Sequence, residues 1–176
     1  MSLIVIFILA VGLSMDAFSL SMIYGTLNLK PRMQKLMSIM VGIFHFFMPL
    51  IGYQIGELIL KIIKVNPDIL IGIIFIILGL QMLLSLKKEE QVKLLTGIVS
   101  VVFFAFTVSI DSFSIGIGFG VANVNMILPC IFFSITSALF TYIGVLLGNK
   151  LADRFGNITT LIGSIILIIL GISYIL

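Results

Sequence analysis

The chain has 176 residues, of which 61% are hydrophobic and only 10% are charged, and its formal net charge is +3. A soluble domain needs roughly a quarter charged residues to cover its surface, so this composition excludes a soluble globular fold and indicates an integral membrane protein. A single cysteine, Cys130, excludes a disulfide framework within the chain and a cysteine-based zinc site, and the small net charge argues against a nucleic-acid partner.

Six apolar runs follow one another along the chain. Each has about 18 residues or more, which is enough for a helix to cross a ~30 Å hydrocarbon layer. In order, the runs cover Leu3–Leu29, Leu36–Leu60, Ile69–Leu86, Leu94–Ala122, Met126–Leu147 and Ile158–Leu176. The sequence therefore predicts an all-α integral membrane protein with six transmembrane helices lying in the lipid bilayer.

The positive residues between these runs are unevenly distributed. Eight of them follow the first, third and fifth runs: Lys30, Arg32, Lys35, Lys87, Lys88, Lys93, Lys150 and Arg154. Only Lys61 and Lys64 lie in the other connections. Because basic loops stay in the cytoplasm, we expect both termini to be extracytoplasmic.

The two halves of the chain resemble each other. Ser14–Gly25 matches Ser109–Gly120 at an offset of 95, with identical residues at five of twelve positions, and Gly52 and Gly56 match Gly144 and Gly148 at an offset of 92. Each half contributes three helices, so the second half would be inverted in the membrane, as in many secondary transporters. We therefore predict a first repeat over 1–86, a charged cytoplasmic loop over 87–93 and a second repeat over 94–176.

Asp16 and Asp111 are matched acids near the centres of two predicted spans. A charge at the centre of the membrane costs at least ~2.5–3.5 kcal/mol. One buried aspartate could serve only a structural hydrogen bond to a neighbouring helix, but a matched pair favours a shared binding site. Helical spacing places Ser19 beside Asp16, and Thr107 and Ser114 beside Asp111. Such an all-oxygen set suits Mg²⁺, Ca²⁺ or Mn²⁺, and two negative charges balance one divalent cation. These five residues are the predicted metal ligands.

A second set of residues could line the cation path. Pro49 lacks the N–H that would bond the carbonyl of His45, so a free carbonyl and an imidazole lie at one level of the helix. A histidine bonded to a neighbouring helix is an equally good interpretation of His45. Met15 would add a soft thioether ligand, although methionine in an apolar helix usually serves packing. Ser14 and Ser109 occupy matched positions two residues before the aspartates.

Four short stretches carry a family resemblance: Gly12–Phe18, Pro49–Gly52, Ser109–Ser112 and Val124–Asn125. Together they resemble the MntP-type manganese efflux pump family, and the resemblance covers essentially the whole chain. It implies a plasma-membrane exporter of Mn²⁺ built from two related three-helix halves, with Asp16 and Asp111 at the positions of the family's functional aspartates. Members of that family usually carry Gln or Glu where this chain has His45.

The expected function is therefore a secondary transporter, not an enzyme, that exports Mn²⁺ and needs no cofactor. The sequence contains no P-loop, so an opposing ion must supply the energy, and carboxylates that hold either metal or protons suggest proton exchange. One alternative is an intramembrane aspartyl protease that uses Asp16 and Asp111. Another is a non-transporting, sporulation-type membrane protein. That group shares the motifs, but its members have a longer central segment, which this chain lacks.

Overall fold

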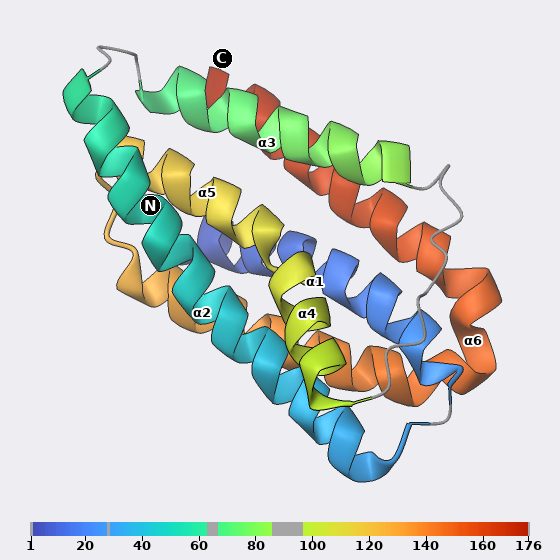
Figure 1. The fold of residues 1–176 in the computed structure, drawn as a ribbon. Coiled ribbons are helices and arrows are strands. Elements are labelled where there is room, and N and C mark those ends of the chain that lie inside the picture. Colours follow the sequence, from blue (N-terminus) through green and yellow to red (C-terminus); the bar gives the residue numbers. More distant parts are fainter. Residues whose placement is uncertain (1, 28, 63–66, 86–96, 176) are drawn as a thin grey trace.

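The computed structural model describes residues 2–27, 29–62, 67–85 and 97–175, which form helices and short connections (Figure 1). In chain order the helices are α1 (Leu3–Gly25), α2 (Pro31–Ile62), α3 (Pro67–Ser85), α4 (Ile98–Val108), α5 (Ile110–Val121) and α6 (Ile127–Ile175). The prediction of an all-α fold is confirmed. The charged loop predicted over 87–93 lies outside the described residues.

Four helical stretches in the described part of the chain are long and apolar enough to cross a membrane: Leu3–Gly25, Pro31–Ile59, Ile98–Val121 and Ile127–Gly148. A shorter apolar helical stretch covers Leu161–Ile175. The protein is therefore a multi-pass membrane protein. The helix boundaries differ from the six predicted spans in two places. The fourth predicted span is divided into α4 and α5, and the fifth and sixth predicted spans are joined in α6.

α6 is a single helix of 49 residues that contains the segment Asn149–Lys150, where we predicted a loop. Polar residues there mark the edge of the apolar run, but the following residues include no proline, so nothing in the local sequence forces the helix to end. Figure 1 shows that α6 bends and that its last part runs back beside α3. Gly72 of α3 and Gly171 of α6 pack backbone to backbone in this contact.

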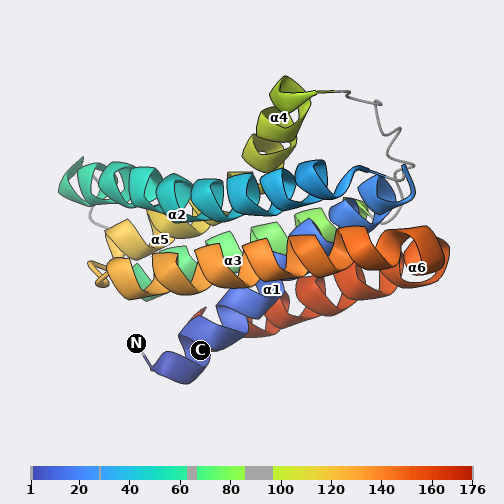
Figure 2. The ribbon, with the colours of Figure 1, turned by 90° about the horizontal axis from the view of Figure 1, so that it is seen from below.

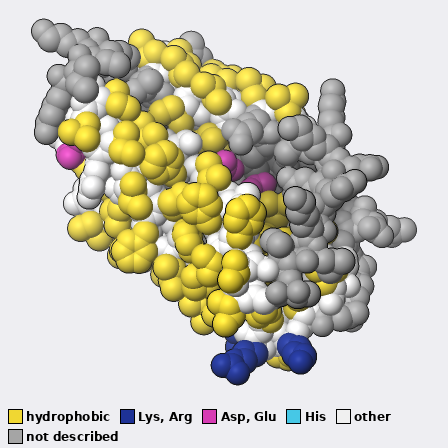
Figure 3. Space-filling view, viewed as in Figure 1, with side chains coloured by type: hydrophobic (Ala, Val, Ile, Leu, Met, Phe, Trp, Pro, Cys, Tyr) yellow, Lys and Arg dark blue, Asp and Glu magenta, His cyan; other side chains and the backbone are white. Residues whose placement is uncertain are grey.

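Several polar side chains are buried inside the bundle, while many large apolar side chains face outward. Val99 is 84% exposed and Phe103 is 62% exposed, whereas Ser14, Ser137 and His45 are completely buried. Hydrophobic side chains cover much of the face seen in Figure 3, and acidic side chains reach its middle. This distribution suits a lipid environment, where only the interior offers polar groups a hydrogen-bond partner.

Two hydrophobic clusters hold the helices together. The first joins α1, α3, α5 and α6 and includes Leu13, Phe75 and Ile115. The second joins α1, α2, α4 and α6 and includes Ala17 and Phe104. Because Leu13 and Ala17 belong to α1, this helix is held between the two clusters, and Asp16 lies between these anchored residues.

Glycines allow two pairs of helices to touch through their backbones. A methyl group on Gly148 of α6 would collide with the carbonyl oxygen of Met22 in α1, and one on Gly56 of α2 would collide with the carbonyl oxygen of Ile117 in α5. Such close crossings are typical of small-residue contacts between membrane helices, where van der Waals packing drives association.

Both termini lie toward one end of the bundle, opposite the connection between α1 and α2 (Figures 1 and 2). That connection and the start of α2 carry Lys30, Arg32 and Lys35, which are exposed. Basic side chains gather at this end in the space-filling view (Figure 3). The termini and this basic cluster are therefore separated by the length of the membrane-spanning helices.

Candidate functional site

Asp16 is half-buried in the uninterrupted helix α1. Gly12 lies one turn before it and is buried, and a methyl group on Gly12 would reach only ordinary contact with Ile166 in the last part of α6, at 3.5 Å. Ser19, three residues after Asp16, is 8% exposed. The carboxylate therefore shares one helix face with a small residue and with the buried hydroxyl of Ser19, which the helical spacing predicted.

Asp111 lies in the first turn of α5, directly after a break in the helix. α4 ends at Val108 and α5 begins at Ile110, and Figure 2 shows α4 projecting away from the direction of α5. A carboxylate in the first turn is stabilised by the free N–H groups and the positive end of the helix dipole. Asp16 has no such arrangement, since α1 continues through it.

The break changes which hydroxyls accompany Asp111. Ser114 belongs to the same helix α5, is half-buried, and its Oγ lies 3.4 Å from the carbonyl oxygen of Ile110. Thr107 belongs to α4, is exposed, and donates to the carbonyl oxygen of Phe103 at 2.9 Å. The prediction that Thr107 shares a face with Asp111 assumed one straight helix, and the break between them removes that assumption.

Serine side chains that bond to their own backbone surround the break. Ser109 Oγ donates to the carbonyl oxygen of Ala105 at 2.6 Å, and Ser112 Oγ donates to the carbonyl oxygen of Ser109 at 2.7 Å. The Ser109 N–H donates to the carbonyl oxygen of Phe106, three residues earlier, which makes a tighter turn than the four-residue spacing of an α-helix. Serine hydroxyls that compete for helix carbonyls in this way bend helices, and no proline is present between residues 98 and 121.

Two hydrogen bonds between helices connect the serines that precede the aspartates to the rest of the bundle. Ser14 Oγ lies 3.1 Å from Ser137 Oγ of α6, and Ser109 Oγ lies 2.9 Å from His45 Nδ1 of α2. Ser14 also donates to the carbonyl oxygen of Ala10 at 2.6 Å, as Ser109 does to that of Ala105. Ser14 within α1 and Ser109 at the break thus each bond a carbonyl oxygen four residues earlier and a side chain on another helix.

His45 is completely buried, and its hydrogen bonds define its tautomer. Nδ1 lies 3.0 Å from the carbonyl oxygen of Val41, which can only accept, so Nδ1 carries the proton. Ser109 Oγ, whose own proton is directed at the carbonyl oxygen of Ala105, lies 2.9 Å from the same Nδ1, so the single Nδ1–H is shared between the Val41 and Ser109 oxygens. In the neutral ring Nε2 then holds a lone pair, and this buried atom has no hydrogen-bond partner among the described residues.

The remaining two candidates for the cation path are Pro49 in α2 and Met15 in α1. Pro49 is buried within α2, which continues through it, and its backbone packs against Gly116 of α5. Pro49 therefore brings α2 close to the helix that carries Asp111. Met15 is half-buried beside Asp16 in the sequence.

Among the described residues, no group of three or more His, Cys, Asp or Glu side chains is placed to hold a metal ion. His45 therefore does not complete a three-residue cluster with Asp16 and Asp111 in this conformation. A metal ion held by the two carboxylates would need its other ligands from hydroxyl groups, backbone carbonyls or water. Oxygen ligands of this kind suit hard divalent cations.

Comparison with known proteins finds relatives along nearly the whole chain. Residues 28–175 match the family model Mntp, described as "Putative manganese efflux pump". The chain belongs to the MntP family. A relative from Methanosphaera stadtmanae is 33% identical over 175 residues, with 97% of both chains covered, and one from Bacillus cereus strain B4264 is 37% identical over 172 residues, with 97% of this chain and 94% of the relative covered. Both relatives are described as "Putative manganese efflux pump MntP", and this description names a transporter rather than an enzyme. No solved structure matches the chain.

Two features of this MntP chain were not predicted from its sequence: the break at Ser109 and the pairing of Ser14 with Ser137. A signal for the break is present, since Thr107, Ser109, Ser112 and Ser114 place four hydroxyls within eight residues. The pairing with Ser137 required the three-dimensional contact of α1 with α6.

Proposed function

We propose that this MntP chain is a secondary transporter that exports Mn²⁺, with Asp16 and Asp111 as its charged ligands. The observation that carries the proposal is a half-buried carboxylate at matched positions of two membrane-spanning segments, in a chain of the manganese efflux pump family. Two carboxylates balance the charge of one divalent cation. The hydroxyls of Ser19 and Ser114 add hard oxygen ligands.

The two halves form inverted repeats in this proposal. Its support is that contacts come in matched pairs at the offsets of the sequence repeat: the Ser14–Ser137 hydrogen bond corresponds to the Ser109–His45 hydrogen bond. The glycine contacts correspond in the same way, since Gly148 approaches Met22 and Gly56 approaches Ile117.

A further contact supports a pseudo-twofold axis at the crossing of α2 and α6. Gly42 packs against Ser134, and these two residues are related by the offset of 92. In two inverted repeats, a residue that contacts its own repeat mate lies next to the axis. His45 and Ser137 follow these residues by three positions each, so the polar pairs that include them would flank the axis.

The broken helix at Ser109 would contribute to cation binding. Transporters commonly bind ions at discontinuous helices, because half-helix ends present unpaired backbone groups inside the membrane. Helix carbonyls point along the axis toward the C-terminal end, so the last carbonyls of α4 lie at the break, and Asp111 follows in the first turn of α5. Carbonyl oxygens and a carboxylate are both suitable Mn²⁺ ligands. We therefore place the cation beside this break, between Asp111 and Asp16.

Export requires an energy source. Moving one charge against the membrane potential costs ~2.3 kcal/mol per 100 mV, so exporting Mn²⁺ costs about twice that. We propose that protons entering the cell supply this energy by protonating Asp16 and Asp111 and releasing the metal. With the basic connection at Lys30, Arg32 and Lys35 in the cytoplasm, both termini would be extracytoplasmic.

Proteoliposomes test this proposal. Vesicles with an acidic interior should accumulate Mn²⁺ against its own gradient, because protons leaving the vesicle drive metal inward, and collapse of the pH gradient should stop uphill uptake. Asp16→Asn and Asp111→Asn should each abolish uptake in protein that still reconstitutes normally. Uphill transport that continued unchanged without a pH gradient would refute proton coupling, and transport by both Asn variants would refute the metal site.

A further inference from the structure

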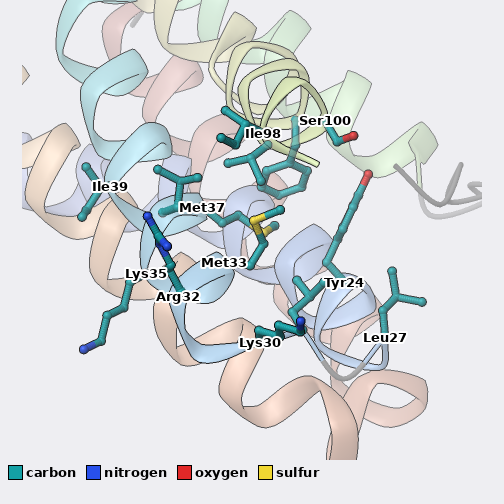
Figure 4. A pocket seen from close by; sticks show the side chains of 14 residues that line it. Tyr24, Leu27, Lys30, Arg32, Met33, Lys35, Met37, Ile39, Ile98 and Ser100 are labelled. Carbon is teal, nitrogen blue, oxygen red and sulfur yellow. The ribbon is translucent and has the colours of Figure 1, made fainter. Parts of the chain in front are cut away.

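A cavity of about 800 Å³ opens at the end of the bundle where α1 ends and where α2 and α4 begin (Figure 4). Its walls are mainly apolar and include Met37 of α2 and Val101 and Phe104 of α4. This volume lies within the ~300–1,000 Å³ range of ordinary ligand pockets. The cavity is distinct from the candidate cation site, since neither Asp16 nor Asp111 lines it.

Three basic residues lie around this apolar space: Lys30, Arg32 and Lys35. All three are exposed, and Figure 4 shows them on the connection and on the first turns of α2, beside Met33 and Met37. Within the part of the chain that the structure describes, no Asp or Glu lines the cavity. The positive charges make this a poor entrance for a divalent cation and a favourable place for an anion.

The combination of an apolar wall and a basic rim selects the occupant. A small soluble anion would leave the apolar wall unused, and a neutral apolar molecule would leave the basic side chains without a partner. A phospholipid with an anionic headgroup satisfies both, and basic pockets between membrane helices bind such headgroups. We propose that this cavity is a binding site for an anionic phospholipid, with its phosphate among Lys30, Arg32 and Lys35 and an acyl chain along Met37, Val101 and Phe104.

The position of the cavity links this lipid to the break in the fourth span. Val101 and Phe104 belong to α4, which ends at Val108, next to Ser109. An acyl chain packed on these residues bears on the half-helix that precedes Asp111. The lipid would therefore help to hold α4 in its orientation.

The absence of tryptophan from the chain allows a direct test. Ile98 lines the cavity, so Ile98→Trp introduces a single fluorescent reporter, and Ile169→Trp places a matched reporter on an exposed position of α6 outside it. Each variant is reconstituted with a small fraction of brominated phosphatidylglycerol or brominated phosphatidylcholine. The ratio of quenching by the two lipids is compared, so that the depth of each reporter cancels. Only a brominated acyl chain quenches, so a free phosphate ion gives no signal.

We expect phosphatidylglycerol to quench the Ile98→Trp reporter preferentially, with each basic residue contributing about a fivefold preference. Adding Lys30→Gln, Arg32→Gln and Lys35→Gln should abolish the preference, whereas Lys30→Arg, Arg32→Lys and Lys35→Arg should keep it. The Ile169→Trp reporter should show no preference, and an unchanged emission from it in the neutralised background verifies folding. Equal quenching by both lipids at Ile98→Trp, or a preference that survives neutralisation, would overturn the proposal.

Discussion

Alanine substitutions at the two matched glycine contacts test how closely the helices pack. A methyl group on Gly148 would collide with the carbonyl oxygen of Met22, and one on Gly56 with that of Ile117. The obstacle is backbone in both cases, so the helices must separate. We expect Gly148→Ala and Gly56→Ala each to lower the free energy of unfolding by about 1–3 kcal/mol.

Gly12 provides the matched control within α1. Its added methyl group would lie 3.5 Å from Ile166 Cγ2 and 4.0 Å from Leu167 Cγ, which is ordinary van der Waals contact with side chains. Alanine also favours a helix over glycine by up to about 1 kcal/mol. Gly12→Ala should therefore leave stability unchanged or slightly increased.

The single cysteine supplies the assay. Cys130 is free and completely buried, so a dye that fluoresces on reaction with a thiol reports unfolding as the temperature rises. A loss of 1–3 kcal/mol corresponds to a fall in Tm of about 2–12 °C for a chain of this length. The packing argument fails if Gly148→Ala and Gly56→Ala melt like the unmodified protein, or if Gly12→Ala falls as far as they do.

Two other predictions concern the buried polar pairs. Ser14→Ala and Ser109→Ala each remove a hydrogen bond between helices and should lower the free energy of unfolding by about 0.6–1.7 kcal/mol in the thiol assay. Ser173 is exposed and bonds only its own helix, so Ser173→Ala should not change this free energy. Equal losses in all three variants would contradict the prediction. His45→Phe removes the buried Nε2 and should reduce Mn²⁺ transport by roughly 10–100-fold, while His45→Gln, which keeps a polar group there, should retain most of it. Full transport by His45→Phe would show that neither nitrogen of His45 is needed for transport.

The sequence predicts the parts of this structure that depend on hydropathy and spacing. The composition and the long apolar runs were sufficient for the all-α membrane fold, and helical spacing placed Ser19 beside Asp16 because α1 has no interruption. The same spacing assumed a continuous helix from Thr107 to Asp111, whereas the structure divides it at Ser109, where serines bond to their own backbone. Likewise, the polar Asn149–Lys150 marked the end of an apolar run but not the end of α6.

The tertiary pairs could not be predicted from a single segment. The hydrogen bond between Ser14 and Ser137 joins residues 123 positions apart, and that between Ser109 and His45 joins residues 64 positions apart. Hydrophobic patterns state which face of a helix is buried but not which residue of another helix meets it. The repeat offsets relate the two pairs to each other, but only the contact of α1 with α6 shows that Ser137 is the residue that meets Ser14.

Metal binding to the purified protein tests the central proposal most directly. The electron paramagnetic resonance signal of free Mn²⁺ decreases when the ion binds, so a titration counts the bound metal. We expect one Mn²⁺ per unmodified chain and none for Asp16→Asn or Asp111→Asn, with both variants melting normally in the thiol assay and Ser173→Ala binding as the unmodified protein does. If either Asn variant still bound one Mn²⁺ with unchanged affinity, the two aspartates would not share a metal ion, and the proposed site would be contradicted.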